Sequence, residues 1–405
     1  MGKKIPTSVS FNLPDGKEVT IETGKLATQA RGSVVVRIED TMILATIVSA
    51  YEPRENAAFF PLSVDYQEKY AAVGRIPGNF FRRETRLNDY EILISRLVDR
   101  AIRPLFPDGY MHDTQVILTL HSSDQRNLPD AYAALAASAA IVVSDINWNG
   151  PISEVRVAKI NGEYVVNPEK EALESAELEI IVAATMDNVM MVEGEANECQ
   201  EADLIEAIKV GHEAIKVQCK AQLELAQLVG EAATVKRVLP EAPSSDEAFA
   251  LVKEVTTDKI IAVAHGAMDK VTRKDALKAI KSELKEAAAE KGDEWMAEHG
   301  SFISAYFDKH KKATLREVVM SEKVRLDGRA TDQVRPIWTE VDYLPAAHGS
   351  AIFNRGETQA LASLTLGTKL DKKMEDTALA QTYEKFMLHY NFPALSVGEI
   401  KPMRG

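Results

Sequence analysis

The sequence predicts a mixed α/β (α+β) protein in which one domain occurs twice and an all-helical domain lies between the two copies. Three observations support this prediction. Short β-rich segments alternate with helical segments up to about residue 230, and residues 246–319 consist almost entirely of helix formers. A pattern from the start of the chain then returns near its end, and a repeat at so large a separation indicates a duplicated domain.

Composition describes an ordinary globular protein and restricts its partners. The chain has 405 residues, enough for about two or three domains. Its two cysteines, Cys199 and Cys219, do not form a disulfide scaffold and fit a reducing compartment. We find neither a signal peptide at the start nor an apolar run of membrane-spanning length, so we expect a cytoplasmic protein without a membrane partner. The net charge of −13 means that any nucleic-acid contact must be local and basic.

The first predicted domain, residues 1–235, begins with strands and ends with a long helix. We expect a hairpin around Asp15–Gly16 and a second turn at Asn161–Gly162. Residues 130–143 (DAYAALAASAAIVV) are small and apolar throughout, which indicates a helix buried on several sides. The predicted strands are 8–13, 17–22, 33–38, 42–49, 115–121, two within 154–166, and 178–184, and the long helix covers 198–228.

Residues 240–247 (PEAPSSDE) have the composition of a linker. Beyond it, Leu277, Ile280 and Leu284 mark one apolar face of an amphipathic helix, and lysine and glutamate occupy the other. We therefore predict an all-α domain at 245–320 and interpret it as a packing spacer. The second α/β copy follows at 321–405.

The repeat defines this architecture. Residues 32–46 (GSVVVRIEDTMILAT) align without a gap to residues 349–363 (GSAIFNRGETQALAS). A shorter match places Phe60-Pro61 and Ser63-Val64 on Phe392-Pro393 and Ser396-Val397. With about eighty residues, the second copy holds only the beginning of a domain, so we expect it to be truncated.

One arginine-dense stretch, residues 74–104, is the candidate functional site. It holds seven arginines and no lysine. Arginine binds phosphate oxygens with a planar fork, and the neighbouring Phe80 and Phe81 offer faces on which the bases of a single strand can stack. The first half of the stretch is therefore predicted to be a loop that binds a flexible polyanion, most plausibly single-stranded RNA.

The second half of the stretch is predicted to be a helix. Asn88 can cap it, with Glu91 as capping-box partner, and Pro104 ends it. Arg96, Arg100 and Arg103 fall on one face. In the alternative interpretation, these arginines pair with Asp89, Glu91 and Asp99 on an ordinary exposed helix.

Several long blocks together carry a family resemblance over essentially the whole chain. They are VDYQEKYAAVGRIPGNFFRRETR, SRLVDRAIRPLFP, RLDGRATDQVRPI, HGSAIFNRGETQALASLTLGT and HYNFPALSVGE. The chain resembles bacterial polynucleotide phosphorylase (polyribonucleotide nucleotidyltransferase) in its N-terminal portion. The resemblance implies two RNase PH-like domains, of βαβ type and similar to ribosomal protein S5, on either side of the all-α domain.

The same resemblance implies an activity. Members of the family are homotrimers that degrade single-stranded RNA from the 3′ end with inorganic phosphate, release nucleoside diphosphates, and can polymerise them in reverse. They participate in mRNA degradation and RNA processing, with RNA-degradation partners that the sequence does not identify. The match assigns RNA binding to two groups of residues. The loop group is Phe80, Phe81, Arg82, Arg83 and Arg86, and the helix group is Arg96, Arg100 and Arg103.

The resemblance also implies what this chain lacks. The family's Mg²⁺ ligands and phosphate-binding segment are expected downstream of Gly405, so no catalytic and no metal-binding residue is assigned here. Arg329, Arg335, His348 and Arg355 fall in matching blocks without individual roles. Two hypotheses remain. The chain is part of a phosphate-dependent exoribonuclease, or it is a non-catalytic module that binds RNA and assembles rings. Zinc binding is disfavoured by the scattered histidines, and acidic pairs such as Asp124 and Asp130 are expected to be solvated or capping.

Overall fold

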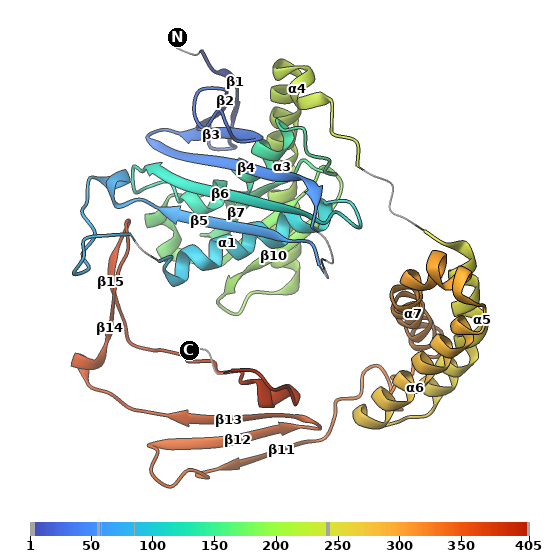
Figure 1. The fold of residues 1–405 in the computed structure, drawn as a ribbon. Coiled ribbons are helices and arrows are strands. Elements are labelled where there is room, and N and C mark those ends of the chain that lie inside the picture. The colour runs from blue at the N-terminus through green and yellow to red at the C-terminus, as the bar shows by residue number, and fades with distance from the viewer. Residues whose placement is uncertain (1–4, 55–56, 58, 85, 240–243, 403–405) are drawn as a thin grey trace. The chain divides into compact units, whose positions relative to one another are not determined.

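The computed structural model describes residues 5–54, 57, 59–84, 86–239 and 244–402. The chain divides into two compact units, residues 1–240 with 371–405, and residues 241–370. Figure 1 shows the strands and helices that make up these units. The predicted linker, residues 240–247, lies partly outside the described residues, and the predicted domain boundaries stay predictions.

The first unit is built on a six-stranded sheet. Its order is β1-β2-β3-β4-β6-β5, antiparallel except for β5, which runs parallel to β6. Alternate residues such as Val34, Val36, Ile43 and Ala45 face a core that α1 and α2 cover. The strands are β1 (Thr7–Asn12), β2 (Glu18–Thr23), β3 (Gly32–Ile38), β4 (Thr41–Pro53), β5 (Leu62–Glu68) and β6 (His112–Ser122).

The helix α2 (Ala133–Val142) is buried at every residue, as the run of small apolar side chains predicted. Gly32 at the start of β3 lies so close to α2 that a Cβ atom would be 1.9 Å from the carbonyl oxygen of Ala140. The other helix on this face is α1 (Asp89–Ile102). Short 3₁₀ helices, η1 (Tyr70–Val73), η2 (Arg103–Leu105) and η3 (Pro129–Tyr132), connect these elements.

A second, four-stranded antiparallel sheet completes the first α/β unit. Its order is β10-β9-β7-β8, and α3 packs on it with Ala207, Ile215 and Cys219 in the core between them. Burial raises the pKa of the Cys219 thiol to about 12, so this cysteine is not a reactive thiolate. The elements are β7 (Ser153–Ile160), β8 (Glu163–Val166), η4 (Lys170–Ser175), β9 (Ala176–Ala184), β10 (Val189–Ala196), α3 (Glu201–Val229) and α4 (Glu231–Thr234).

The second unit contains a helical bundle and a small sheet. Ile260, Leu284 and Phe307 are among the buried residues between the helices, and the predicted apolar face of Leu277, Ile280 and Leu284 lies in this core. The bundle consists of α5 (Asp246–His265), α6 (Lys270–Ala289) and α7 (Asp293–Glu322). The sheet consists of β11 (Ile337–Val341), β12 (Gly349–Arg355) and β13 (Thr358–Leu364), in that order.

The longer repeat is confirmed by strand register. β3 pairs with β4 from Gly32↔Ile47 to Ile38↔Thr41, and β12 pairs with β13 from Gly349↔Leu364 to Arg355↔Thr358. Each of these four residues in the second copy lies 317 positions after its counterpart in the first copy. The connecting turns agree as well, because Glu39 and Gly356 both have positive φ, 48° and 60°.

The shorter repeat match is wrong. Ser63-Val64 lies in β5, whereas Ser396-Val397 lies in the 3₁₀ helix η6 (Ala394–Val397). The structural counterpart of η6 is η1, since both end at a glycine in the left-handed region, Gly398 and Gly74. The chain between the two repeated elements differs in length between the copies, so a dipeptide match could not fix the correspondence.

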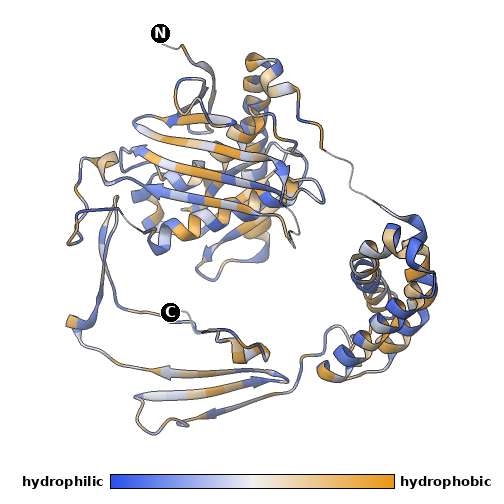
Figure 2. Cartoon of the chain, in the orientation of Figure 1, coloured by the Kyte–Doolittle hydropathy of each residue, from blue (hydrophilic) through white to orange (hydrophobic). Residues whose placement is uncertain are grey.

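The sheet of the second copy has apolar side chains on its surface. All residues of β11 and β13 are exposed, and Figure 2 shows the hydropathy along these strands. Trp338, Phe353 and Leu361 are among the exposed apolar residues. Phe353 corresponds to Val36 of β3, which is buried in the core beneath α2 in the first copy.

Candidate nucleic-acid interface

The predicted RNA-binding loop, residues 74–88, is called the arginine loop below. It leaves η1 at Gly74 and enters α1 at Asn88. Phe80 and Phe81 lie at its apex with 93% and 75% of their surfaces exposed. Their rings meet edge to face, with centroids 5.3 Å apart. Two apolar rings kept in solvent are unfavourable for an isolated fold, and they present faces to which a base can stack.

Three arginines of the loop and one of the helix that follows it are available to a ligand. Arg82, Arg83 and Arg86 of the loop and Arg96 of α1 are exposed, and within the described part of the chain none of the four forms an ion pair. Arg82 has a φ of 52° and donates from Nη1 to the carbonyl oxygen of Pro77 at 3.1 Å. The left-handed conformation is uncommon for a residue with a side chain. The apex is therefore a tight turn that displays guanidinium groups rather than pairing them.

The end of the loop is fixed by a capping box, as predicted. The Asn88 side chain accepts from the Glu91 backbone N–H at 2.9 Å, and Glu91 accepts from the Asn88 N–H at 2.7 Å. The same Glu91 carboxylate accepts the backbone N–H of Glu68 at 2.7 Å. The carboxylate thus ties the start of α1 to the end of β5, which fixes where the loop re-enters the fold.

Glu84 connects the loop to the start of η1 by hydrogen bonds. Its carboxylate accepts from Lys69 Nζ and from the Tyr70 backbone N–H, both at 2.8 Å. Partial burial acts to raise the pKa of Glu84, but these two donors outweigh it and lower the pKa. Glu84 therefore stays ionised and is engaged with its own fold, so it does not neutralise the neighbouring arginines.

The helix arginines divide into two kinds. Arg96 is exposed, whereas Arg100 pairs with Glu193 of β10. Arg103 binds Asp99 through two hydrogen bonds of 2.6 and 2.9 Å and donates to the carbonyl oxygens of Phe60 and Leu62. The alternative interpretation thus describes Arg103, which pairs with Asp99 as that interpretation expected; Arg100 is paired as well, but with Glu193, which was not among the expected partners. Their assignment to RNA stays a prediction, one that these contacts do not favour.

A polar hollow of about 700 Å³ lies elsewhere in the first unit, and no local sequence pattern indicates it. Arg126, Arg156 and Lys170 line it together with Asp124 and Asp130. Asp130 pairs with Arg156, and Asp124 accepts backbone N–H groups of residues 126 and 127, the capping role expected of it.

Buried carboxyl groups lie near this hollow. Burial raises the pKa of Glu68 to about 7, against the hydrogen bond it accepts from Tyr66. Glu154 has no exposed surface, and neither of its oxygens has a hydrogen-bond partner among the described residues. Burial, reinforced by the charge of Asp130, raises its pKa to about 8. Glu68 lies in β5 and Glu154 lies in β7, so these two acids lie near the hollow only in the folded protein.

The two raised pKa values predict a pH-dependent stability. The folded state binds these protons more tightly than the unfolded state, where the pKa is near 4.5, so the contribution of these two groups to stability is greatest below that value. It should fall as the pH rises through about 7 and about 8, by on the order of 3 kcal/mol for each group. Glu154→Gln should roughly halve the fall. Hydrogen exchange of the β7 and β9 amides from pH 5 to 8, corrected for intrinsic rates, measures this.

The control for that experiment is Glu163→Gln, the same substitution at an exposed position of β8. It should leave the pH dependence as in the unchanged chain. An equal fall in the Glu154→Gln variant and the unchanged chain would show that Glu154 does not titrate with folding.

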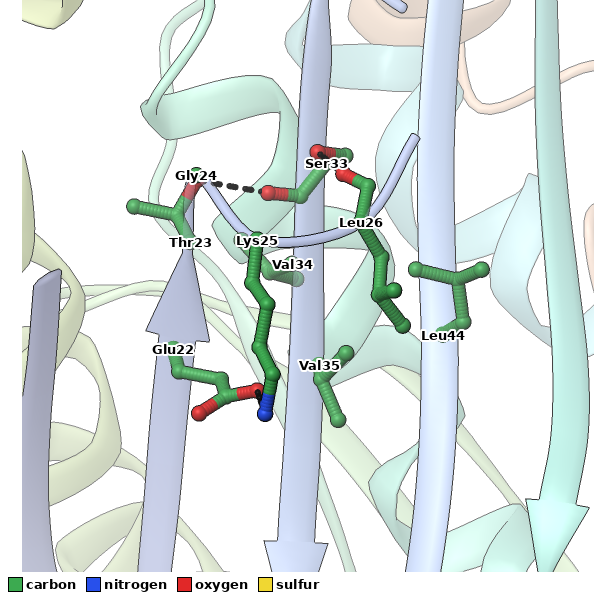
Figure 3. A pocket seen from close by; sticks show the side chains of 9 residues that line it. All are labelled: Glu22, Thr23, Gly24, Lys25, Leu26, Ser33, Val34, Val35 and Leu44. Atoms are coloured by element: carbon green, nitrogen blue, oxygen red, sulfur yellow. Dashed lines mark hydrogen bonds and ion pairs between the residues drawn. The ribbon is translucent and has the colours of Figure 1, made fainter. Parts of the chain in front are cut away.

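A second hollow, among the described residues, offers no chemical centre. A shallow hollow beside β2 and β3 contains Lys25 near Glu22, at 4.0 Å, and a hydrogen bond from Thr23 to the Ser33 carbonyl (Figure 3). Among the described residues, no group of three or more His, Cys, Asp or Glu side chains could hold a metal ion. None of the helices formed by those residues is long and apolar enough to cross a membrane.

Residues of the second copy that lacked roles make local contacts. Arg329 pairs with Asp327 at 2.9 Å, and His348 Nδ1 accepts the Leu366 backbone N–H at 2.9 Å. Arg335 packs against Gly356, where a Cβ atom would lie 3.0 Å from its side chain. Of these contacts, that of Arg335 lies at the β12–β13 turn, and that of His348 lies at the opposite end of the same hairpin.

Comparison with protein families gives three matches along the chain. Residues 15–147 and 333–405 match the 3′ exoribonuclease family, domain 1, and residues 150–214 match domain 2 of the same family. Residues 248–330 match the polyribonucleotide nucleotidyltransferase RNA binding domain. The first match occurs on both sides of the helical bundle, which agrees with the duplication.

Curated relatives cover nearly the whole chain. Polyribonucleotide nucleotidyltransferase of Bacteroides fragilis is 52% identical over 401 residues, which are 99% of this chain and 56% of that protein. The same protein of Cytophaga hutchinsonii is 51% identical over 98% of this chain and 54% of its own length. The chain thus spans about half the length of the curated relatives it matches. A solved chain titled "archaeoglobus fulgidus exosome with RNA bound to the active site" is 19% identical with a TM-score of 0.39, covering 51% of this chain and 90% of that one. This similarity is too low to bear on fold or function.

Proposed function

The chain belongs to the 3′ exoribonuclease family, and from this premise we propose that its protein is a phosphate-dependent 3′-to-5′ exoribonuclease. In this proposal it degrades single-stranded RNA, releases nucleoside diphosphates, and can polymerise them in reverse. The identity of about half of all residues to polyribonucleotide nucleotidyltransferases supports the assignment. Inorganic phosphate is then the co-substrate.

The arginine loop carries the part of this function that we assign to the described residues. Arg82, Arg83 and Arg86 of the loop and Arg96 of the adjoining α1 are exposed and form no ion pair with the described residues, so their guanidinium groups can bind phosphates. Exposed Phe80 and Phe81 beside them can stack on bases. Stacking requires unpaired bases, so the combination favours a single strand over a duplex. The net charge of −13 confines the attraction to this basic patch.

The helical bundle supplies a second proposed contact with RNA. Its interpretation as a packing spacer is incomplete, because it matches a family described as an RNA binding domain. Lys270, Lys274, Lys278 and Lys285 of α6 are exposed at spacings of four, four and seven residues, which place them on one helical face. Such a lysine face binds a phosphate backbone without reading sequence.

Mg²⁺ does not fit the described residues, because they offer no cluster of metal ligands. We therefore derive no chemical step through a metal, and we assign no catalytic residue to this chain. The second candidate function, a non-catalytic module that binds RNA, is supported by the exposed arginines and phenylalanines of the arginine loop. Assembly as a homotrimer, a cytoplasmic location and partners in RNA degradation belong to the proposal for the whole protein.

Phosphorolysis by this 405-residue chain is the experiment that separates the two functions. The chain is incubated with a homopolymeric RNA, Mg²⁺ and inorganic phosphate, and released nucleoside diphosphates are quantified. RNA binding without release would favour the binding module. Release that requires phosphate would instead show that the chain carries a complete catalytic centre. A reaction without phosphate is the control, and release there would exclude phosphorolysis.

A further inference from the structure

The stem of the arginine loop is held by a hairpin from the far end of the chain. The hairpin consists of β14 (Lys373–Asp376) and β15 (Gln381–Glu384), and it belongs to the same compact unit as the loop. Arg75 forms an ion pair with Asp376 at 2.7 Å and donates to the carbonyl oxygens of Thr377 and Ala378 at 2.8 and 3.1 Å. One guanidinium thus binds both the strand end and the turn of the hairpin.

Two further contacts make the fit specific. The Tyr70 hydroxyl donates to the Asp376 carbonyl oxygen at 2.6 Å, and Ala378 at the tip of the turn is only 2% exposed. Gly78 lies against the Asp376 carboxylate so closely that a Cβ atom would be 2.0 Å from Oδ2. The loop therefore needs a glycine where the hairpin touches it, and the hairpin needs an acid there.

A third contact joins the hairpin to the helix that follows the loop. Lys373 Nζ lies 3.0 Å from Asp89, the first residue of α1, and 2.7 Å from Glu375. The hairpin thus touches the chain both before and after the loop apex. Between these contacts the apex has its own hydrogen bonds, such as Asn79 Nδ2 to the Arg83 carbonyl oxygen at 2.5 Å.

We propose that Asp376 is a positioning residue for RNA binding, through which the β14–β15 hairpin holds the arginine loop in its binding conformation. This inference rests on the proposed function of the loop. A loop that is already ordered loses less conformational entropy when RNA binds, so its affinity is higher than that of a free loop with the same side chains. Arg75 then binds the hairpin, and it is not one of the phosphate-binding arginines.

If Asp376 positions the loop, its removal should change RNA affinity in the direction opposite to the one that charge alone predicts. Removing a carboxylate near a basic patch should, by charge alone, strengthen binding of a polyanion. We expect Asp376→Ala to weaken binding of a fluorescent single-stranded oligonucleotide about tenfold. Because no phosphate contact is lost, the slope of log affinity against log salt should stay unchanged. Exchange of the amides of residues 74–84 should become faster, while β3 and β4 exchange as before.

Two further variants complete this experiment, one as a control for charge and one as a second test. Glu384→Ala removes the same charge from an exposed position at the other end of the hairpin, and it should leave affinity and exchange unchanged or strengthen binding slightly. Arg75→Lys keeps the positive charge but loses the planar fork that reaches two carbonyl oxygens. It should weaken binding in the same way as Asp376→Ala, and it provides the test if the alanine variant does not fold.

The outcomes separate the inference from the proposed function. In one outcome, the Arg82→Ala/Arg83→Ala variant fails to bind RNA while Asp376→Ala and Arg75→Lys bind as the unchanged chain does. In that case Asp376 has no positioning role, but the arginine loop is still the RNA site. If Arg82→Ala/Arg83→Ala binds RNA normally, the loop is not the RNA site and the inference fails with it. Stronger binding by Asp376→Ala would show that its charge only repels RNA.

Discussion

An Arg82→Ala/Arg83→Ala variant is expected to bind single-stranded RNA roughly a hundredfold more weakly at low salt. Each exposed guanidinium that binds a phosphate contributes about 1.5 kcal/mol, the lower end of the range for charge-assisted hydrogen bonds, so the loss of two corresponds to a factor of about a hundred. Each phosphate contact also releases counterions, so the slope of log affinity against log salt should become shallower by about 0.7 for each arginine. Titration of a labelled oligonucleotide at several salt concentrations measures both effects.

A matched control tests whether position matters or only charge. Arg37→Ala/Arg126→Ala removes the same formal charge from two exposed arginines that pair with Asp40 and Glu39, outside the loop. This variant should bind nearly as well as the unchanged chain. An unchanged salt slope in the loop variant, or equal losses in both variants, would remove the loop from the RNA site.

Local sequence patterns predicted the site's local structure well. The capping box of Asn88 and Glu91 depends on residues three apart, and it is present as predicted. The end of α1 at Ile102, just before Pro104, follows from proline's missing N–H. The exposed apex agrees with the prediction of a loop that presents arginines and phenylalanines.

Long-range contacts limited what the sequence could predict. In the sequence, Arg75 and Arg103 cannot be told from the other arginines of the arginine-dense stretch, but in the fold both side chains bind other parts of the protein. Arg75 reaches a hairpin about 300 residues away, and Arg103 reaches the backbone of residues 60 and 62. Such contacts depend on the tertiary arrangement, which no local spacing encodes.

Two strands of the first α/β copy, β5 and β10, were not predicted as individual elements. The polar and acidic residues of β10 (VMMVEGEA) weaken the alternation typical of strands, whereas β5 (LSVDYQE) alternates from Leu62 to Gln67 and could have been predicted from that pattern. Partner strands compensate, because β5 pairs along its whole length with β6, and β10 pairs with β9 through a register shift. Pairing with a well-buried neighbour can hold a strand whose own sequence indicates it weakly.

The Gly32→Ala substitution is expected to have the largest effect on stability. The added methyl group would lie 1.9 Å from the Ala140 carbonyl oxygen and 3.0 Å from its carbonyl carbon, both backbone atoms of α2. A flexible side chain could move aside, but a buried helix cannot without disturbing its contacts with β3 and β4. We expect a loss of about 3 kcal/mol in the free energy of unfolding of the first unit. Hydrogen exchange of the α2 and β3 amides measures it.

Gly349→Ala provides a control within the same chain. Gly349 occupies the same register position in the second copy, but a Cβ atom there would meet only Leu364 side-chain atoms at 3.6 Å, an ordinary contact. The substitution should therefore change stability by less than about 0.5 kcal/mol. Equal losses at Gly32 and Gly349 would mean that glycine is needed for the hairpin itself. A loss confined to Gly32 would show that the close approach of α2 creates the requirement for glycine.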